Sequence, residues 1–319
     1  MKILFIGYSN VFKKRILPIL DKLPYITEVH IAKYKDQIWD NDHFEIKCQV
    51  KTFDSYEEDF YQSDADIAYI SSVNSDHFKS AKIALEKGLH TIIDKPATLS
   101  LTDLETLLNI STKKNILLAE SVVYTYHPKV KEIKNIFNKK DLQHINVIFS
   151  FPPLDSNNFR YKEELGGGVI NDTGPYAASI GRYFFNEIPK KIYCNIVNGG
   201  NETFPIDICY TILMEYSSGR TLTGLFSFIT EYVNMAQFLG KDLFISTDRI
   251  FSIPENSHNL MSIKTKDYTS IHYTEKGNSF LLFFEEVLSS IRYKNYKKFE
   301  NDMYMDGQIL NMIRSRKNF

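Results

Sequence analysis

Residues 89–96 read Leu-His-Thr-Ile-Ile-Asp-Lys-Pro, a short apolar run that ends in an acid, an amine and a proline. The apolar part predicts a buried parallel strand. Pro96 ends this strand, because proline has no N–H to donate to a ladder and fixes its own φ. Asp94 and Lys95 therefore stand at the carboxyl end of the strand, which is the edge where open α/β sheets bind ligands. A solvated lysine in a βα turn is the alternative interpretation.

Strands and helices alternate on both sides of this segment. Further strands are expected over residues 2–7, 27–32, 66–72 and 116–119. Ser100 is expected to cap the helix that follows Pro96, and the strand after that helix brings Glu120 to the same carboxyl edge. This alternation predicts a parallel sheet, and therefore a Rossmann dinucleotide-binding domain over residues 1–122.

The turn after the first strand stands where a dinucleotide-binding fold carries the GxGxxG pattern. Gly7 keeps the first glycine, but Ser9 and Phe12 occupy the other two positions, so the fingerprint is depleted. Three cations, at positions 13–15, fall in the first turn of the next helix, whose amino end is already electropositive. A bound pyrophosphate would relieve this repulsion, and a solvated basic face is the alternative.

The end of the second strand bears on the choice of cofactor. An NAD site places an acid there to bind the ribose 2′-hydroxyl, whereas an NADP site places a cation. The chain has Lys33 and Lys35, which favour NADP(H), and Asp36, which leaves NAD(H) open.

The second half of the sequence predicts a different architecture. Long strands are expected over residues 144–151, 207–216 and 220–228, the last two forming a hairpin around Ser217-Ser218-Gly219. We therefore expect residues 123–319 to form an α+β domain with a large, open, mostly antiparallel sheet, which binds substrate. The free face of such a sheet needs a cover, and a second copy is the simplest one, so a homodimer or homotetramer is expected.

Residues 165–176 read Leu-Gly-Gly-Gly-Val-Ile-Asn-Asp-Thr-Gly-Pro-Tyr. So many glycines would be costly in a plain helix, and they suit a place where backbone passes close to a ligand. Asp172 and Tyr176 are four residues apart and would share one helix face, where they could handle a proton. A helix-start acid beside a packed tyrosine is the alternative.

Composition limits the possible functions. At 319 residues two domains are expected, and 43% hydrophobic with 24% charged residues is ordinary globular composition. The formal charge of −1 gives no basic excess for nucleic acid or a membrane surface. Three cysteines without CxxC spacing argue against a disulfide framework and a structural zinc site. The first residues are too short an apolar run for a signal peptide, so a soluble, cytoplasmic protein is expected.

Together these segments resemble the glucose–fructose oxidoreductase/inositol dehydrogenase/MocA family. The family's Glu-Lys-Pro is similar to residues 94–96, its Glu-Ala-Phe…His-Pro segment to residues 120–128, and its Gly-Gly-Gly-x-x-x-Asp-x-Gly-x-His segment to residues 166–176, with Tyr176 in place of histidine. Residues 15–18, 151–153 and 160–161 resemble the branch that reduces 3-keto groups of nucleotide-linked deoxysugars.

The resemblance implies hydride transfer between nicotinamide C4 and a sugar carbon, in a cleft between the domains and without a metal. Tyr176 would donate the proton, Lys95 would stabilise the oxyanion and lower the pKa of Tyr176, and Asp172 would hold Lys95 or a substrate hydroxyl. The residues expected at the cofactor are Gly7, Ser9, Asn10, Val11, Lys33, Lys35, Ser72, Asn74, His77, Asp94, Lys95, Glu120 and Arg160.

Two other functions are compatible with the same motifs. One is a dehydrogenase of a free sugar, a polyol or a trans-dihydrodiol. The other is a non-catalytic regulator that keeps the cofactor site. The intact set of Lys95, Asp172 and Tyr176 argues against this second alternative.

Overall fold

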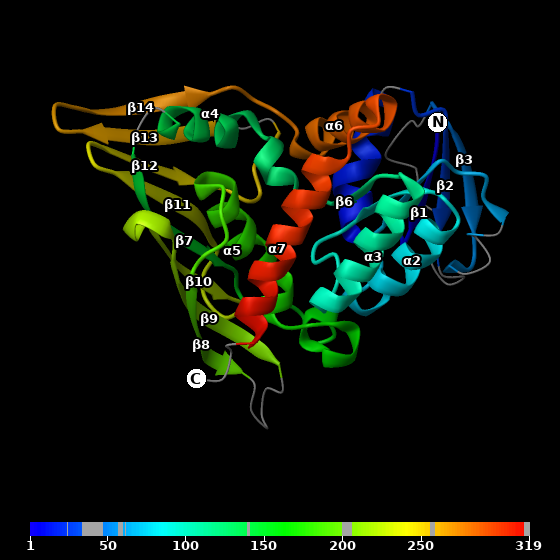
Figure 1. Cartoon of the computed structure of the whole chain (residues 1–319), viewed down its shortest axis with the longest axis horizontal. Helices are drawn as coiled ribbons and strands as arrows, with labels where there is room; N and C mark the ends of the chain where they lie inside the picture. Colours follow the sequence, from blue (N-terminus) through cyan, green and yellow to red (C-terminus); the bar gives the residue numbers. More distant parts are fainter. Residues whose placement is uncertain are drawn as a thin grey trace. The chain divides into compact units, whose positions relative to one another are not determined.

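The computed structural model describes residues 1–23, 25–33, 47–56, 60, 62–138, 141–199, 206–255 and 259–315 (Figure 1). The chain divides into two compact units, Met1–Ser121 with Phe280–Tyr304 and Val122–Ser279 with Met305–Phe319. These units differ from the predicted domains at Val122, which belongs to the second unit, and in the segment Phe280–Tyr304, which packs with the first unit. There Phe284 stacks on Tyr69 with ring centroids 5.6 Å apart.

The described strands of the first unit form a parallel sheet in the order β3-β2-β1-β4-β5-β6. Their bounds are β1 Lys2–Ile6, β2 Glu28–Ala32, β3 Gln49–Phe53, β4 Ile67–Ile70, β5 His90–Ile93 and β6 Leu118–Glu120. This order is that of a Rossmann fold, which confirms the predicted fold class of the first half. Strand β3 was not predicted, because its mostly exposed residues give no apolar run.

Helices α2 (His77–Glu86) and α3 (Leu101–Lys114) lie side by side against the first sheet (Figure 1). The Ser100 hydroxyl accepts a hydrogen bond from the Asp103 N–H at 3.1 Å, so the predicted cap of α3 is present. Gly88 follows α2 with a φ of +86°, a conformation that few residues other than glycine adopt.

The described strands of the second unit form a sheet in the order β14-β13-β12-β11-β7-β10-β9-β8. Their bounds are β7 Leu142–Ser150, β8 Lys191–Gly199, β9 Asp207–Glu215, β10 Thr221–Ser227, β11 Val233–Gly240, β12 Leu243–Asp248, β13 Asn259–Thr265 and β14 Thr269–Thr274. Among these strands every neighbouring pair is antiparallel except β7 with β10. The predicted open, mostly antiparallel sheet and the hairpin of β9 with β10 are confirmed.

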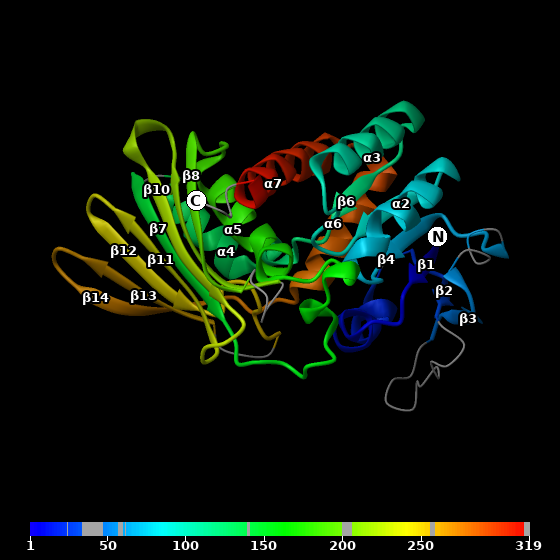
Figure 2. The same ribbon diagram turned by 90° about the horizontal axis from the view of Figure 1, so that it is seen from below.

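Helices α4 (Pro128–Phe137) and α5 (Val169–Phe185) lie on one face of this sheet (Figure 2). The strand residues on this face are buried, including Val147, Ile212 and Phe238. The opposite face is partly exposed and carries hydroxyl and amide side chains. At its centre the Asn146 amide donates to Gln237 at 3.1 Å. The prediction that a second copy covers this face is untested.

Helix α6 spans Ser279–Tyr293 and α7 spans Lys297–Ser315. Within the described residues, no helix combines the length and apolar character that crossing a membrane requires. The predicted cytoplasmic location stays a prediction.

A buried ion pair joins α5 to α7 in the second unit. The Arg182 guanidinium donates twice to the Asp306 carboxylate, each time at 2.7 Å, and both residues are buried. Nearby, the two helices approach so closely that a Cβ at Gly174 would lie 2.6 Å from Leu310. The pair therefore fixes the register of two helices in contact.

Removing one partner of this pair should be strongly destabilising. Asp306→Ala leaves the Arg182 charge buried without its carboxylate, which should lower the free energy of unfolding by about 3–5 kcal/mol. The matched control is Asp302→Ala on the same helix, because the Lys298–Asp302 pair is exposed and should contribute about 1 kcal/mol or less. Urea denaturation followed by circular dichroism measures both, and equal losses would contradict the prediction.

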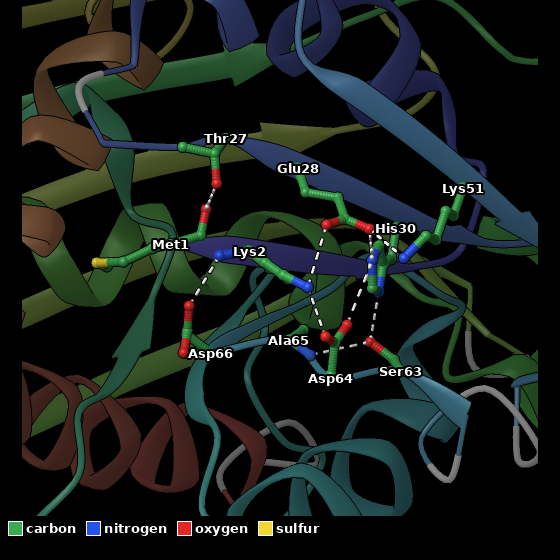
Figure 3. A network of polar contacts seen from close by, with 10 residues as sticks. All are labelled: Met1, Lys2, Thr27, Glu28, His30, Lys51, Ser63, Asp64, Ala65 and Asp66. Carbon is green, nitrogen blue, oxygen red and sulfur yellow. Dashed lines mark hydrogen bonds and ion pairs between the residues drawn. The ribbon is translucent and has the colours of Figure 1, made fainter.

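A second polar network lies at the amino ends of β1 and β2 (Figure 3). The Glu28 carboxylate accepts from Lys51, from His30 at 2.9 Å and from Lys2 at 3.1 Å. Lys2 also pairs with Asp64 at 2.5 Å. The hydrogen bonds from Lys51 and His30, with that from Lys2, outweigh the effect of burial and lower the pKa of Glu28 from 4.5 to about 2.

Glu28 should make stability depend on acid pH. Because folding lowers its pKa, its contribution is complete above pH 4.5 and is lost as the pH falls toward 2. Glu28→Gln should therefore be less stable than the wild type near neutral pH, and the difference should shrink below about pH 3. Urea midpoints across this range measure the effect. Glu86→Gln, from an exposed pair with Lys82, is the control. A deficit that does not change with pH would refute the prediction.

Candidate functional site

The carboxyl edge of the first sheet gathers most of the predicted cofactor residues. The strand order reverses between β1 and β4, which is the switch point where open α/β sheets bind their ligands. Gly7 follows β1, Ser72 closely follows β4, Asp94 follows β5, and Glu120 ends β6. The sequence therefore predicted the members of this edge correctly, although their roles at a cofactor remain untested.

Gly7 directly follows β1 at this switch point. Its φ is +107°, and a Cβ there would stand 2.6 Å from the Ser71 carbonyl oxygen. Only glycine fits at this position. The backbone can thus turn directly over the end of β4, as the first glycine of a dinucleotide fingerprint does.

Ser9 stands where that fingerprint has its second glycine, and its side chain turns inward. Its hydroxyl lies 2.5 Å from the Ser71 hydroxyl and accepts from the Phe12 N–H at 3.1 Å. Asn10 is exposed and Val11 partly exposed at the start of the helical segment Phe12–Ile16. Asn10 and Val11 therefore remain accessible on this loop, although Ser9 replaces the second fingerprint glycine.

Lys33 is buried at the end of β2, and its ammonium donates to Asp54 at 2.5 Å. A cofactor phosphate at this position would share the ammonium with that carboxylate. Lys35 and Asp36 lie outside the described residues. Of the two lysines that favour NADP(H), Lys33 is the one in the described part of the chain. Its ammonium already donates to the Asp54 carboxylate.

Ser72 and Asn74 lie in the segment after β4, and His77 is the first residue of α2. The Ser72 hydroxyl oxygen is buried and has no hydrogen-bond partner in the described part of the chain, and Asn74 is also buried. The His77 ring nitrogens lie 2.8 Å from the Pro96 carbonyl oxygen and 3.1 Å from that of Ser72. Burial lowers the pKa of His77, so the neutral ring donates to only one of them. His77 therefore holds two loops together, and its predicted cofactor contact is untested.

The two acids of the edge hold the chain around Lys95. The Asp94 carboxylate accepts from Tyr69 at 2.5 Å, from Ser71 at 2.7 Å and from Ser121 at 2.8 Å. Glu120 accepts from the Ala97 N–H at 2.8 Å. Lys95 lies between these anchors and is partly exposed.

The glycines before α5 serve the chain's own backbone. A Cβ at Gly167 would lie 2.6 Å from the Arg160 carbonyl oxygen, and the Gly168 N–H donates to that oxygen at 2.9 Å. Gly168 also lies against Asp207, whose carboxylate accepts from the Ile170 N–H at 2.8 Å. The sequence suggested that these glycines let the backbone approach a ligand. In the described residues they instead let it approach the loop of Arg160 and strand β9.

Asp172 and Tyr176 share one helix, as predicted, and Arg160 joins them. Arg160 Nε lies 2.9 Å from Asp172 Oδ2, and Asp172 is buried. Burial works to lower the pKa of Arg160, but the charge of Asp172 and the nearby Tyr176 phenol outweigh it, so the pKa is raised. The described charged partner of Asp172 is therefore Arg160.

Aromatic rings surround Tyr176 on the second unit. Phe251 stacks on it at 4.7 Å, and Phe149 and Tyr124 meet it edge to face at 5.3 and 6.0 Å. These contacts fix the plane of the phenol ring while it stays partly exposed. Sequence reasoning missed these partners, since they lie in three segments remote from the glycine motif: Phe149 on β7, Phe251 after β12 and Tyr124 in the short helix Val123–Tyr126.

The site has features that fit a dinucleotide. The orphaned Ser72 hydroxyl and the turn at Gly7, which excludes a side chain, offer a donor and a close backbone approach at the switch point. Among the described residues, the cluster suited to a metal ion is Glu28, His30 and Asp64 at the opposite edge. Lys2 and Lys51 already neutralise its carboxylates (Figure 3), so it carries no argument for a cation.

Known proteins resemble the chain along most of its length. The dTDP-3,4-didehydro-2,6-dideoxy-α-D-glucose 3-reductase of Saccharopolyspora spinosa is 24% identical over 265 residues, which cover 82% of this chain and 78% of that protein. The enzyme of the same name from Actinomadura kijaniata is 21% identical over 326 residues, which cover 97% and 93%.

A crystal structure of a 3-ketoreductase from Actinomadura kijaniata, in complex with NADP and TDP-benzene, has the same fold. The TM-score is 0.91 at 18% sequence identity, with 99% of this chain and 98% of that chain covered.

Family models match part of each unit. The model of an oxidoreductase family with an NAD-binding Rossmann fold matches residues 1–121, and that of the GFO/IDH/MocA C-terminal domain matches residues 141–244. The matched segments include the whole carboxyl edge of the first sheet and the helix of Asp172 and Tyr176. The chain therefore belongs to the GFO/IDH/MocA family of NAD(P)-dependent oxidoreductases.

Proposed function

We propose that this protein reduces a keto group, at C3, of a nucleotide-activated deoxysugar with NADPH. The observation that carries the proposal is the anchored Lys95 at the carboxyl edge of a Rossmann sheet, in a chain that also carries Tyr176 beside Arg160 and Asp172. The similarity to sugar-nucleotide 3-reductases over nearly the whole chain supports the choice of substrate.

Bound NADPH supplies the hydride. As the carbonyl carbon accepts it, negative charge grows on the carbonyl oxygen, and the Lys95 ammonium is suited to stabilise that charge. Tyr176 is the proposed proton donor to this oxygen. Once Tyr176 has given up its proton, the positive charge of Arg160 stabilises the phenolate that remains, because the guanidinium lies close to the phenol. Asp172 holds that guanidinium in place.

His127 is a poor alternative acid. It is fully buried, and its Nδ1 accepts from the Lys129 N–H at 3.1 Å. Burial and the positive charge of Lys129 lower the pKa of His127 to about 4, so the ring is neutral near neutral pH. A neutral imidazole in that position has little tendency to donate a proton to a sugar oxygen.

We also propose that two copies associate through the second unit's sheet, as a dimer or within a tetramer. The face opposite α4 and α5 is partly exposed across eight described strands, and apolar side chains such as Leu260, Ile271 and Tyr273 are strongly exposed at its β14 edge. Leu260 and Tyr273 are directly paired across β13 and β14. A self-complementary contact would bury this face.

Calorimetric titration should separate the candidate substrates. We expect NADPH to bind more tightly than NADH, and TDP or UDP to bind the NADPH complex at a distinct site. NADPH binding without a nucleotide site would indicate a free sugar, polyol or dihydrodiol as substrate. A preference for NADH would mean that Lys33 does not contribute to a phosphate site.

Replacing Lys95 and Tyr176 should separate chemistry from binding. Lys95→Met with Tyr176→Phe should bind NADPH normally and lose about 10²- to 10⁴-fold in turnover of the keto sugar, because stabilisation of the oxyanion and the proton are both lost. The matched controls are Lys82→Met and Tyr304→Phe, which lie on α2 and α7 and should keep wild-type turnover. A double variant that retains most activity would assign the proton to another group.

A further inference from the structure

Three hydroxyl groups, one on β4 and two that directly follow β4 and β6, converge on Asp94, the residue next to Lys95. We propose that Tyr69, Ser71 and Ser121 are positioning residues for Lys95, which they hold through the Asp94 carboxylate, and that Ser9 ties this arrangement to the dinucleotide loop. The inference deepens the proposed function and rests on it, since it concerns how Lys95 is presented to the reacting carbonyl.

The Asp94 carboxylate accepts hydrogen bonds from three neutral donors. Oδ1 accepts from Tyr69 and Ser121, and Oδ2 accepts from Ser71, at distances from 2.5 to 2.8 Å. Hydrogen bonds from hydroxyls to a carboxylate are short and about twice as strong as bonds between neutral groups. Burial and the charge of Asp94 raise the pKa of Tyr69 well above 10, so its phenol remains a donor.

The donors themselves are rigid. Tyr69 lies on β4 and is completely buried, with Phe284 stacked on one side and Phe5 tilted at 5.6 Å on another. Ser71 and Ser121 are also buried, and they follow directly after β4 and β6. A carboxylate held by groups of this kind cannot change its rotamer without leaving a buried donor unpaired.

The backbone on both sides of Lys95 is anchored as well. The Asp94 N–H donates to the Ile70 carbonyl at 2.9 Å, the Pro96 carbonyl lies 2.8 Å from His77 Nδ1, and the Ala97 N–H donates to Glu120 at 2.8 Å. Lys95 thus projects from a segment fixed before and after it. Anchoring the root of a long side chain leaves fewer conformations to be lost in the transition state.

Ser9 extends the network to the loop where the cofactor's pyrophosphate is expected. Its hydroxyl meets Ser71, and Ser71 donates to Asp94, so one chain of hydrogen bonds runs from the end of β1 past β4 to β5. The same hydroxyl caps the helical segment at Phe12. The serine that replaces the second fingerprint glycine therefore links the dinucleotide loop to the catalytic lysine.

The test variant is Tyr69→Phe with Ser121→Ala, which removes both donors to Asp94 Oδ1 and keeps the aromatic packing. We expect NADPH affinity within about threefold of the wild type, a KM within about threefold, and a kcat lower by about 10- to 100-fold, the loss typical of a misplaced catalytic group. Tyr69→Phe with Ser121→Thr keeps one hydroxyl and should recover part of kcat.

The matched control is Tyr216→Phe with Ser111→Ala. It also removes a buried phenol and a buried serine hydroxyl, whose partners are Met214 and the Leu108 carbonyl. This control should keep wild-type kcat. A test variant whose kcat matches that of the control would overturn the proposal.

A second readout does not need the sugar substrate. The rate at which an amine-specific reagent modifies Lys95, measured by peptide mass spectrometry with and without NADPH, should change at least threefold in the test variant and not in the control. An unchanged rate overturns the positioning role even if no keto sugar is turned over. A changed rate in a protein that reduces no sugar nucleotide supports the positioning role and refutes only the proposed substrate. Thermal unfolding confirms that each variant is folded, and Tyr69→Phe alone replaces the double variant if that unfolds.

Discussion

The parallel pairing of β1 with β4 is the contact on which the first unit depends. At this pairing the order of the strands reverses, and such a switch point is where open α/β sheets bind their ligands. Because all described strands of this sheet are parallel, every carboxyl end lies at the same edge. Residues far apart in sequence, such as Gly7 and Glu120, thereby belong to one site. The crossing is tight enough to exclude any side chain at Gly7.

Sequence periodicity was sufficient for the buried parts of this sheet. Apolar runs marked β1, β2, β4, β5 and β6, since strands covered on both faces must be almost wholly apolar. Strand β3 was not predicted, because it lies at the edge of the sheet and most of its side chains are exposed. In the second unit the hairpin of β9 and β10 was predictable from its turn. The strands from β11 onward were not identified individually, although β11 to β14 pair with their neighbours in sequence. Most residues of β14 are exposed, so that strand has no apolar run to mark it.

The membership of the candidate site was more predictable than its internal contacts. Family motifs named Lys95, Asp172 and Tyr176, but the hydroxyls around Asp94 come from strand positions that look like ordinary core. Tyr69 is an example, since a tyrosine in an apolar strand signals packing, and only its register against β5 brings the phenol to the carboxylate. Asp172 was expected near Lys95 or a substrate hydroxyl. Its described charged partner is instead Arg160, and no motif indicates that pairing.

The glycine turn before α5 attaches Arg160 firmly to that helix. Its carbonyl oxygen accepts from the Gly168 N–H at the first turn, and its guanidinium reaches Asp172 one turn further along. The arginine is therefore held at two points, one on its backbone and one on its side chain. When substrate enters or product leaves, the cation, the carboxylate and Tyr176 should move as one rigid group. Their mutual electrostatics would then be the same in every position that the helix adopts.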